Sequence, residues 1–108
     1  METVCAKVRL KPGSLDRVRE WATELRTRSD EVLATLRDEG VVIESVFLDS
    51  DEQGDFLVYY MKARSLEGAH AVVQSSFHPI DSYHQQFKVD TWQSQTPLEL
   101  LVDFENFS

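Results

Sequence analysis

The chain of 108 residues is long enough for one domain with a single core and too short for two. Hydrophobic residues make up 42% of it and charged residues 28%, which is typical of a globular protein and excludes the composition of a disordered one. The net charge of −8 argues against nucleic acid and anionic membranes as partners. Without an apolar run of membrane-spanning length or a signal-peptide pattern, we expect a cytoplasmic protein.

The chain opens with a predicted strand from Thr3 to Leu10. Apolar residues take every second position here, while Cys5, Lys7 and Arg9 share the other face. Lys11-Pro12-Gly13 ends this strand.

A long helix is predicted next. Ser14 is a suitable N-cap, the helix begins near Leu15, and Glu24 to Arg28 forms a favourable i,i+4 pair. Apolar residues recur at helical spacing for more than five turns. The sequence therefore predicts one continuous helix that ends at Gly40, in the position where a C-terminal glycine is common.

A hairpin follows this helix. Residues Val41 to Leu48 are rich in β-branched side chains, and Phe56 to Met61 form a second apolar run. The polar stretch Asp49 to Asp55 between them predicts a loop, so the two strands should pair antiparallel. The second strand is apolar on both of its faces.

Two further helices precede the predicted last strand. Ser65 can cap the first, which has an apolar stripe and should end near Ser75-Ser76. Pro79 fits the first position of the second, with His78 just before it. Its inner face should carry four residues at offsets of three, four and seven: Ile80, Tyr83, His84 and Phe87. Alternation from Leu98 to Phe104 then predicts the final strand.

The order of elements predicts an α+β fold of the ferredoxin-like βαββαβ type, with an extra helix before the last strand. Its four-stranded antiparallel sheet would carry helices on one face only. Because Phe56 to Met61 are apolar on both faces, the open face needs a cover. We expect a homodimer that pairs these faces and closes an α+β barrel.

Several stretches carry a resemblance to known proteins. The layout resembles the dimeric α+β barrel superfamily, which includes antibiotic-biosynthesis-type monooxygenases and stress-responsive barrel proteins. The stretches KVRLKPG, RDEGVVIESVFL, FLVYYM and HPIDSYHQQF, which begin at Lys7, Arg37, Phe56 and His78, are similar to a small domain family of unknown function. The resemblance implies the fold and the dimer, and it transfers no activity.

His84 and Tyr83 are the candidate catalytic residues. On the inner face of its helix, His84 would act as a general base or donor in a cavity between helix and sheet. A tyrosine hydroxyl, with Tyr83 as the candidate, would stabilise the resulting enolate. The alternative for His84 is a structural histidine that bonds a backbone carbonyl.

Five residues are candidate ligand contacts: His78, Tyr59, Tyr60, Lys7 and Arg9. His78 suits a cap or loop contact, and only one of the adjacent tyrosines can face the helices. Lys7 and Arg9 would form salt bridges within the sheet, with Glu44 or Glu99, or accept an anionic ligand.

Signatures of metal and cofactor sites are missing from the sequence. The three histidines lack HxH, HxxxH and HExxH spacing, and Cys5 is the only cysteine. No GxSxG motif, phosphate loop or nucleotide fingerprint occurs, so we expect neither a metal nor a cofactor.

Three functional hypotheses remain open at this point. The first is a homodimeric protein that binds a small molecule between its sheet and helices. The second is a cofactor-independent monooxygenase or isomerase that acts on an aromatic or polyketide-like substrate. The third is a structural or interaction module without catalysis. A deep pocket that contains His84 would favour the first two.

Overall fold

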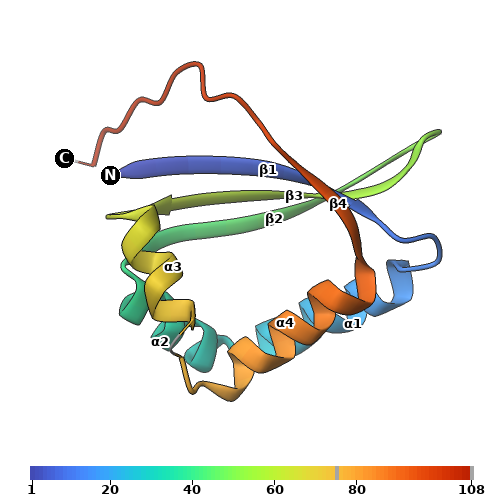
Figure 1. Ribbon diagram of the computed structural model, residues 1–108, viewed down its shortest axis with the longest axis horizontal. Helices are drawn as coiled ribbons and strands as arrows, with labels where there is room; N and C mark the ends of the chain where they lie inside the picture. Colours follow the sequence, from blue (N-terminus) through green and yellow to red (C-terminus); the bar gives the residue numbers. More distant parts are fainter. Residues whose placement is uncertain (75, 108) are drawn as a thin grey trace.

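The computed structural model of the protein describes residues 1–74 and 76–107. The elements follow in the order β1 (Glu2–Leu10), α1 (Leu15–Thr27), α2 (Ser29–Glu39), β2 (Val41–Asp51), β3 (Gly54–Ala63), α3 (Leu66–Gln74), α4 (Pro79–Thr91) and β4 (Trp92–Pro97). All strand pairs are antiparallel, in the order β2-β3-β1-β4, and the helices lie on one side of the sheet (Figure 1). The predicted α+β ferredoxin-like fold with an extra helix is confirmed.

The core lies between the two central strands and the helices. Val8 of β1 pairs with Leu57 of β3, and both side chains are fully buried on the helix side. Trp21 of α1 and Phe87 of α4 cover them, with ring centroids 4.3 Å apart and planes tilted by only 5°. Each such apolar side chain contributes about 1.5–3 kcal/mol when it leaves water. This packing fixes α1 and α4 against the middle of the sheet.

The prediction of one continuous helix from Leu15 to Gly40 is wrong, because the chain bends at Arg28. Its φ of −106° and ψ of 34° leave the helical region and separate α1 from α2. The predicted pair of Arg28 with Glu24 is present at 3.5 Å, and Arg28 also contacts Glu31 in the next helix. The bend brings Leu36 of α2 against a second cluster, made of Val41, Ala63 and Ala69.

The helix ends follow local chemistry only in part. Gly40 ends α2 in the left-handed region at φ 71°, as predicted. Ser65 caps α3 by accepting a hydrogen bond from the Gly68 amide at 3.1 Å. Ser14 makes no such cap, because its hydroxyl instead donates to the carbonyl of Lys11. The last described residue of α3 is Gln74, and Ser75, where we expected the helix to end, lies outside the described residues.

The hairpin between β2 and β3 is tighter than its polar sequence predicts. Asp51 pairs with Gly54, so the loop shrinks from seven residues to the two between them. Side chains stabilise this turn: Asp51 accepts a hydrogen bond from the Gln53 amide at 2.7 Å, and Ser50 donates to Asp55 at 2.7 Å. Gly54 takes a φ of 138°, which a residue with a Cβ rarely adopts.

The predicted final strand is wrong. The strand β4 is the polar stretch Trp92–Pro97, which directly follows α4 and pairs with β1 as an edge strand. Residues 98–107, called here the C-terminal segment, form no helix or strand. The alternation of apolar residues in this segment is typical of a strand, which explains the wrong prediction. In the structure these apolar side chains are largely exposed: Leu98, Leu100, Leu101, Val102, Phe104 and Phe107.

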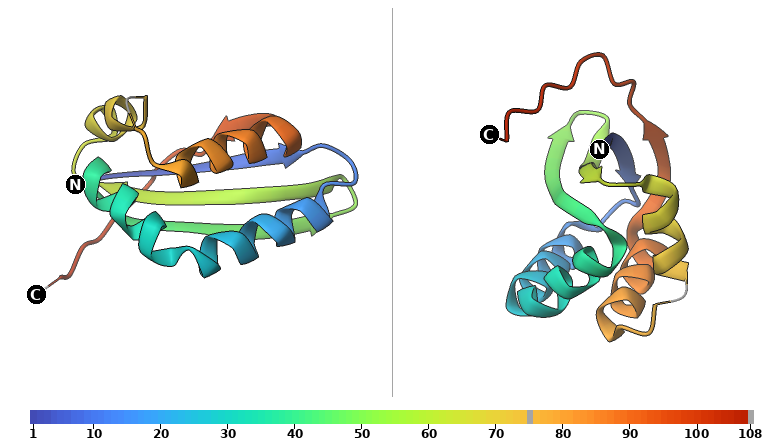
Figure 2. Two further views of the ribbon diagram at one scale, coloured as in Figure 1. Left: turned by 90° about the horizontal axis from the view of Figure 1, so that it is seen from below. Right: turned by 90° about the vertical axis from the view of Figure 1, so that its left-hand side faces the viewer.

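The sheet face that points away from the helices, called here the open face, carries Lys7, Arg9, Phe56, Tyr60 and Lys62. The C-terminal segment passes on this side of the sheet (Figure 2). Lys62 holds it there, with Nζ 2.9 Å from Asp103 and 3.1 Å from Glu105. Among the described residues, no helix has the length and apolar character needed to cross a membrane.

Candidate functional site

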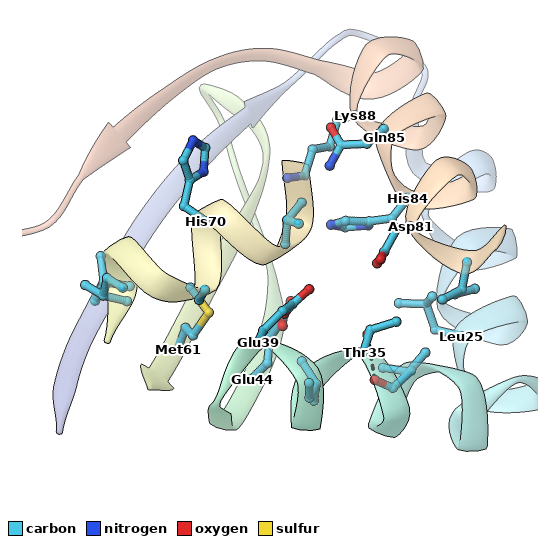
Figure 3. Close-up of a pocket in the computed structure, with 17 residues that line it drawn as sticks. Leu25, Thr35, Glu39, Glu44, Met61, His70, Asp81, His84, Gln85 and Lys88 are labelled. Atoms are coloured by element: carbon cyan, nitrogen blue, oxygen red, sulfur yellow. Dashed lines mark hydrogen bonds between the residues drawn. The ribbon is translucent and has the colours of Figure 1, made fainter. Parts of the chain in front are cut away.

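A cavity of about 510 Å³ lies between the sheet and the helices. One part of its wall is aliphatic and includes Leu25, Leu36, Met61 and Ile80. The other part is polar and includes Glu39, Glu44, Asp81, His84 and Lys88 (Figure 3). A concave site with an apolar body and a few converging polar groups is typical of small-molecule binding.

His84 reaches this cavity because of the way α4 begins and packs. His78 precedes the helix in an extended conformation, and Pro79 takes the first helical turn as predicted. Ile80 and Phe87 are buried on the inner face of α4, which turns the side chain of His84 at the intermediate position toward the cavity.

The protonation state of His84 follows from its neighbours. The indole Nε1 of Trp21 donates a hydrogen bond to Nδ1 of His84 at 3.1 Å, and the two rings stack at 5.7 Å. Burial and, as a smaller effect, the charge of the nearby Lys88 lower the pKa of His84 to about 4, so the imidazole is neutral at pH 7. An indole N–H can only donate, so Nδ1 is the acceptor and the proton of the neutral ring sits on Nε2.

Glu39 is a lining residue of the cavity whose pKa lies near neutrality. Its pKa is raised to about 7, mainly by burial and also by the charges of Asp81, Glu44 and Asp38, while His78 acts in the opposite direction. Burial also raises the pKa of Glu44. Glu39 therefore exchanges a proton readily near pH 7.

Lys88 is the one lysine or arginine among the described lining residues. Burial lowers its pKa, and the carboxyl groups of Glu44 and Glu39 act in the opposite direction. Its Nζ lies over the ring of Trp92, 4.9 Å from the centroid.

Several polar side chains of the cavity lack a hydrogen bond to another side chain in the described part of the chain. In the described part of the chain, no side-chain hydrogen bond satisfies Glu39, Glu44, Gln85 or Lys88. Glu39 and Lys88 are half-buried, and Glu44 and Gln85 are exposed. Their hydrogen-bonding groups are therefore open to water or to a polar ligand in the cavity.

Sequence reasoning missed most of this polar wall. Glu39 is the residue before Gly40, at the C-terminal end of α2, where the helix dipole disfavours a negative charge. An acidic residue at this disfavoured position was the feature of the sequence that could have identified Glu39 as a candidate site residue. Glu44 was considered only as a partner for Lys7 or Arg9, but its side chain is on the helix face of β2.

Tyr83, the second candidate catalytic residue, does not line the cavity described here. Its hydroxyl accepts a hydrogen bond from Nη1 of Arg17 at 3.1 Å, and the Arg17 guanidinium lies over its ring. The structure therefore directs Tyr83 toward α1 and does not bring it together with His84.

His78 also lies apart from His84. Its Nε2 is 2.8 Å from a carboxylate oxygen of Asp38 on α2, at an exposed position. This is the loop contact that the sequence favoured. Within the described residues, no group of three or more histidine, cysteine or acidic side chains is arranged to hold a metal ion.

The adjacent tyrosines point to opposite faces of β3, as expected. Tyr59 faces the helices, with its ring 6.4 Å from His84 and 5.2 Å from Trp92. Burial raises the pKa of its hydroxyl, which has no hydrogen-bond partner within the described residues. Tyr60 pairs in register with Cys5 and lies on the open face.

Lys7 and Arg9 lie on the open face, on the opposite side of the sheet from the cavity. Lys7 forms a salt bridge within the sheet, as expected, but the partner is Asp49 at 3.3 Å and not Glu44 or Glu99. Both cations lie over the ring of Phe56, at 4.4 and 4.7 Å from its centroid. They therefore contribute nothing to the lining of the cavity.

Solved structures with the same fold cover nearly the whole chain. An L-rhamnose mutarotase from Formosa agariphila aligns with a TM-score of 0.65 and 21% identity over 97% of this chain and 100% of its own. An antibiotic biosynthesis monooxygenase aligns with a TM-score of 0.60 and 19% identity over 95% of this chain and 99% of its own. At these identities the likeness shows the fold alone.

The comparison with curated proteins found no match. The family of unknown function DUF6176 matches residues 1–108. The structural neighbours and this match agree with the resemblance read from the sequence. The chain belongs to the DUF6176 family.

Proposed function

We propose that the protein binds a small molecule in the cavity and catalyses a proton transfer on it without a cofactor. The observation that carries this proposal is the presence of Glu39, with a pKa of about 7, and of neutral His84 in the lining of one cavity. A group that titrates near the working pH is suited to general acid–base catalysis.

The two residues would take different roles. The carboxylate of Glu39 would remove a proton from the ligand, either from a hydroxyl or from a carbon next to a carbonyl. His84 would donate its Nε2–H to the ligand oxygen on which negative charge develops. Return of the same proton from Glu39 to a different position on the ligand would give an isomer, with no other reactant consumed.

This assignment changes the role expected for His84. A base needs a free lone pair, but Nδ1 of His84 already accepts from Trp21 and Nε2 carries the proton. The role of base therefore passes to Glu39, and His84 keeps the role of donor. Tyr83 has no part in this proposal, because its hydroxyl binds Arg17.

One structural neighbour is named for an isomerisation. The name of the Formosa agariphila protein, L-rhamnose mutarotase, denotes the interconversion of two forms of a sugar. Such a reaction requires only acid–base groups and no redox partner. The likeness makes the same class of chemistry compatible with this fold, and the residues of the cavity carry the proposal.

We also propose that the protein forms a homodimer through its open face. Its cytoplasmic location stays a prediction. Phe47 on this face is 62% exposed, and the C-terminal segment, which passes on the same side of the sheet, adds further exposed apolar side chains. Apolar surface of this extent favours a partner, and a second copy of the same face is the simplest one.

The test follows isotope exchange in heavy water by proton NMR, with a panel of small sugars and hydroxyketones. We expect wild-type protein to accelerate exchange or isomer interconversion of at least one compound, and Glu39→Gln to abolish the effect. Glu67→Gln, an equal change at an exposed position of α3, is the matched control and should keep full activity. Equal activity in Glu39→Gln, or none in the wild type, would refute the proposal.

A further inference from the structure

We infer that the cavity takes an uncharged, aliphatic molecule that carries several hydroxyl groups. This inference names the ligand class of the site described above and rests on the proposed function for the location of that site. Three features of the lining carry it: the balance of charge, the mixture of donors and acceptors, and the kind of apolar wall.

The charge of the lining disfavours an anionic ligand. Three carboxyl groups, from Glu39, Glu44 and Asp81, face one ammonium group, from Lys88. Even when Glu39 is protonated, the two other acidic groups, Glu44 and Asp81, outnumber the one ammonium group of Lys88, and His84 adds no charge while it is neutral. A carboxylate or phosphate ligand would be repelled in a site partly shielded from water. The anion hypothesis built on Lys7 and Arg9 does not apply to this cavity, because these residues are on the open face.

Donors and acceptors are mixed along the polar wall. His84 offers Nε2–H, Lys88 offers its ammonium hydrogens, and Gln85 offers an amide that both donates and accepts. Glu39 and Glu44 offer acceptors and have no side-chain partner within the described residues. An amine would satisfy the acceptors and leave the donors of His84 and Lys88 without partners. A hydroxyl group donates and accepts at once, so a ligand with several hydroxyls can satisfy both sets.

The apolar part of the lining is aliphatic. Apart from its two histidines, the described lining contains no aromatic side chain, and its apolar members are leucine, isoleucine, valine, alanine and methionine. The aromatic residues of the core lie next to the site instead, where Trp21 and Tyr59 flank the ring of His84. A flat aromatic ligand would find few rings to stack on, whereas a saturated ring can lay its C–H face on the aliphatic wall.

The experiment uses saturation-transfer and titration NMR on the full chain with four groups of probes of similar size. These groups are neutral hexoses and deoxyhexoses, the corresponding uronates, the corresponding hexosamines, and phenols. We expect at least one neutral sugar to bind and to shift the imidazole signals of His84, with affinity at least about tenfold higher than its uronate. Glu44→Gln should reduce the difference in affinity between the neutral sugar and its uronate, because it relieves repulsion of the uronate. Glu67→Gln should leave this difference in affinity unchanged.

Two outcomes overturn the inference: tighter binding of a uronate, hexosamine or phenol than of every neutral sugar, or no binding by any member of the panel. The result is separable from the proposed function, because binding is measured without turnover. If a neutral sugar binds and Glu39→Gln leaves proton exchange unchanged, the ligand class stands and the catalytic role of Glu39 fails. If a phenol binds and undergoes exchange that depends on Glu39, the catalytic proposal stands and the ligand class fails.

Discussion

The indole N–H of Trp21 is a hydrogen-bond donor to Nδ1 of His84, and this contact joins the hydrophobic core to the cavity. Trp21 is 4% exposed and stacks on Phe87, so its own position is fixed by packing. The bond therefore orients the imidazole and leaves Nε2–H for the cavity. A side chain buried in the hydrophobic core thus also determines the chemistry of the site.

Replacing Trp21 with phenylalanine tests this contact. Trp21→Phe keeps an aromatic ring against Phe87 but removes the N–H, and we expect a loss of about 1 kcal/mol in unfolding free energy. Trp21→Ala should cost about 3–5 kcal/mol, because it also leaves a cavity in the core. The decisive measurement is the imidazole nitrogen NMR spectrum of His84, which should change from one Nε2–H tautomer to a mixture of tautomers in Trp21→Phe.

Trp92→Phe is the matched control for this experiment. Trp92 also packs near the site, but its Nε1 makes no hydrogen bond to His84, so the tautomer should stay as in the wild type. An unchanged Nε2–H tautomer in Trp21→Phe would show that the indole does not determine the protonation of His84.

The raised pKa of Glu39 predicts that the unfolding free energy of the protein depends on pH in a specific way. Its pKa of about 7 in the folded protein lies above the ordinary value of 4.5, so the folded state holds the proton more tightly than the unfolded state. The unfolding free energy contributed by Glu39 is therefore greatest at or below pH 4.5 and falls as the pH rises to about 7. We expect Glu39→Gln to gain stability relative to the wild type at pH 8 and to differ little at pH 5.

Urea titrations of both proteins at a series of pH values measure this difference. His84 has the opposite effect, since its lowered pKa makes the folded state less stable as the pH falls from 6.5 to about 4. Because His84 is present in both proteins, its contribution cancels in the comparison. A difference that stays constant from pH 5 to pH 8 would contradict the raised pKa of Glu39.

The sequence predicted those parts of the fold that depend on local pattern. Alternation placed β1 correctly, Gly40 marked the end of α2, and the offsets in α4 put Ile80 and Phe87 on its inner face. These features follow from side-chain periodicity and glycine conformation, which neighbouring residues determine.

The errors arose where tertiary packing overrides local pattern. The bend at Arg28 does not interrupt the apolar stripe, so periodicity could not show it. The polar strand β4 is defined by pairing with β1, whereas the alternating C-terminal segment pairs in no sheet. The cavity combines residues of α2, β2 and α4, and their proximity depends on the crossing of distant elements. His84 was foreseen at the site, but Glu39 and Lys88 were not.

The proposed homodimer can be tested at the open face. Phe47→Glu places a charge on the expected interface, and we expect it to convert the dimer to a monomer in light scattering after size exclusion. Phe77→Glu is the matched control, because Phe77 is 98% exposed in the loop before α4 and does not lie on the sheet. A wild-type protein that is monomeric at micromolar concentration would refute the dimer, and equal dissociation in both variants would show that the open face is not the interface.

The contacts of Lys62 indicate how the C-terminal segment is held to the sheet. Its side chain is 4% exposed, and its Nζ contacts both Asp103 and Glu105, while Thr3 donates a second hydrogen bond to Asp103. The hydrogen bond from Lys62 lowers the pKa of Asp103, in agreement with a carboxylate that stays charged.

Lys62→Met keeps an unbranched apolar stem and removes the charge, so the segment should lose its anchor. We expect faster amide hydrogen exchange over residues 98–107 and earlier cleavage there by a protease, with exchange in the sheet core unchanged. Lys7→Met is the control, because Lys7 lies on the same open face but forms its ion pair with Asp49 and not with the segment. Equal exchange over residues 98–107 in the wild type and in Lys62→Met would show that apolar contacts, and not these ion pairs, hold the segment to the sheet.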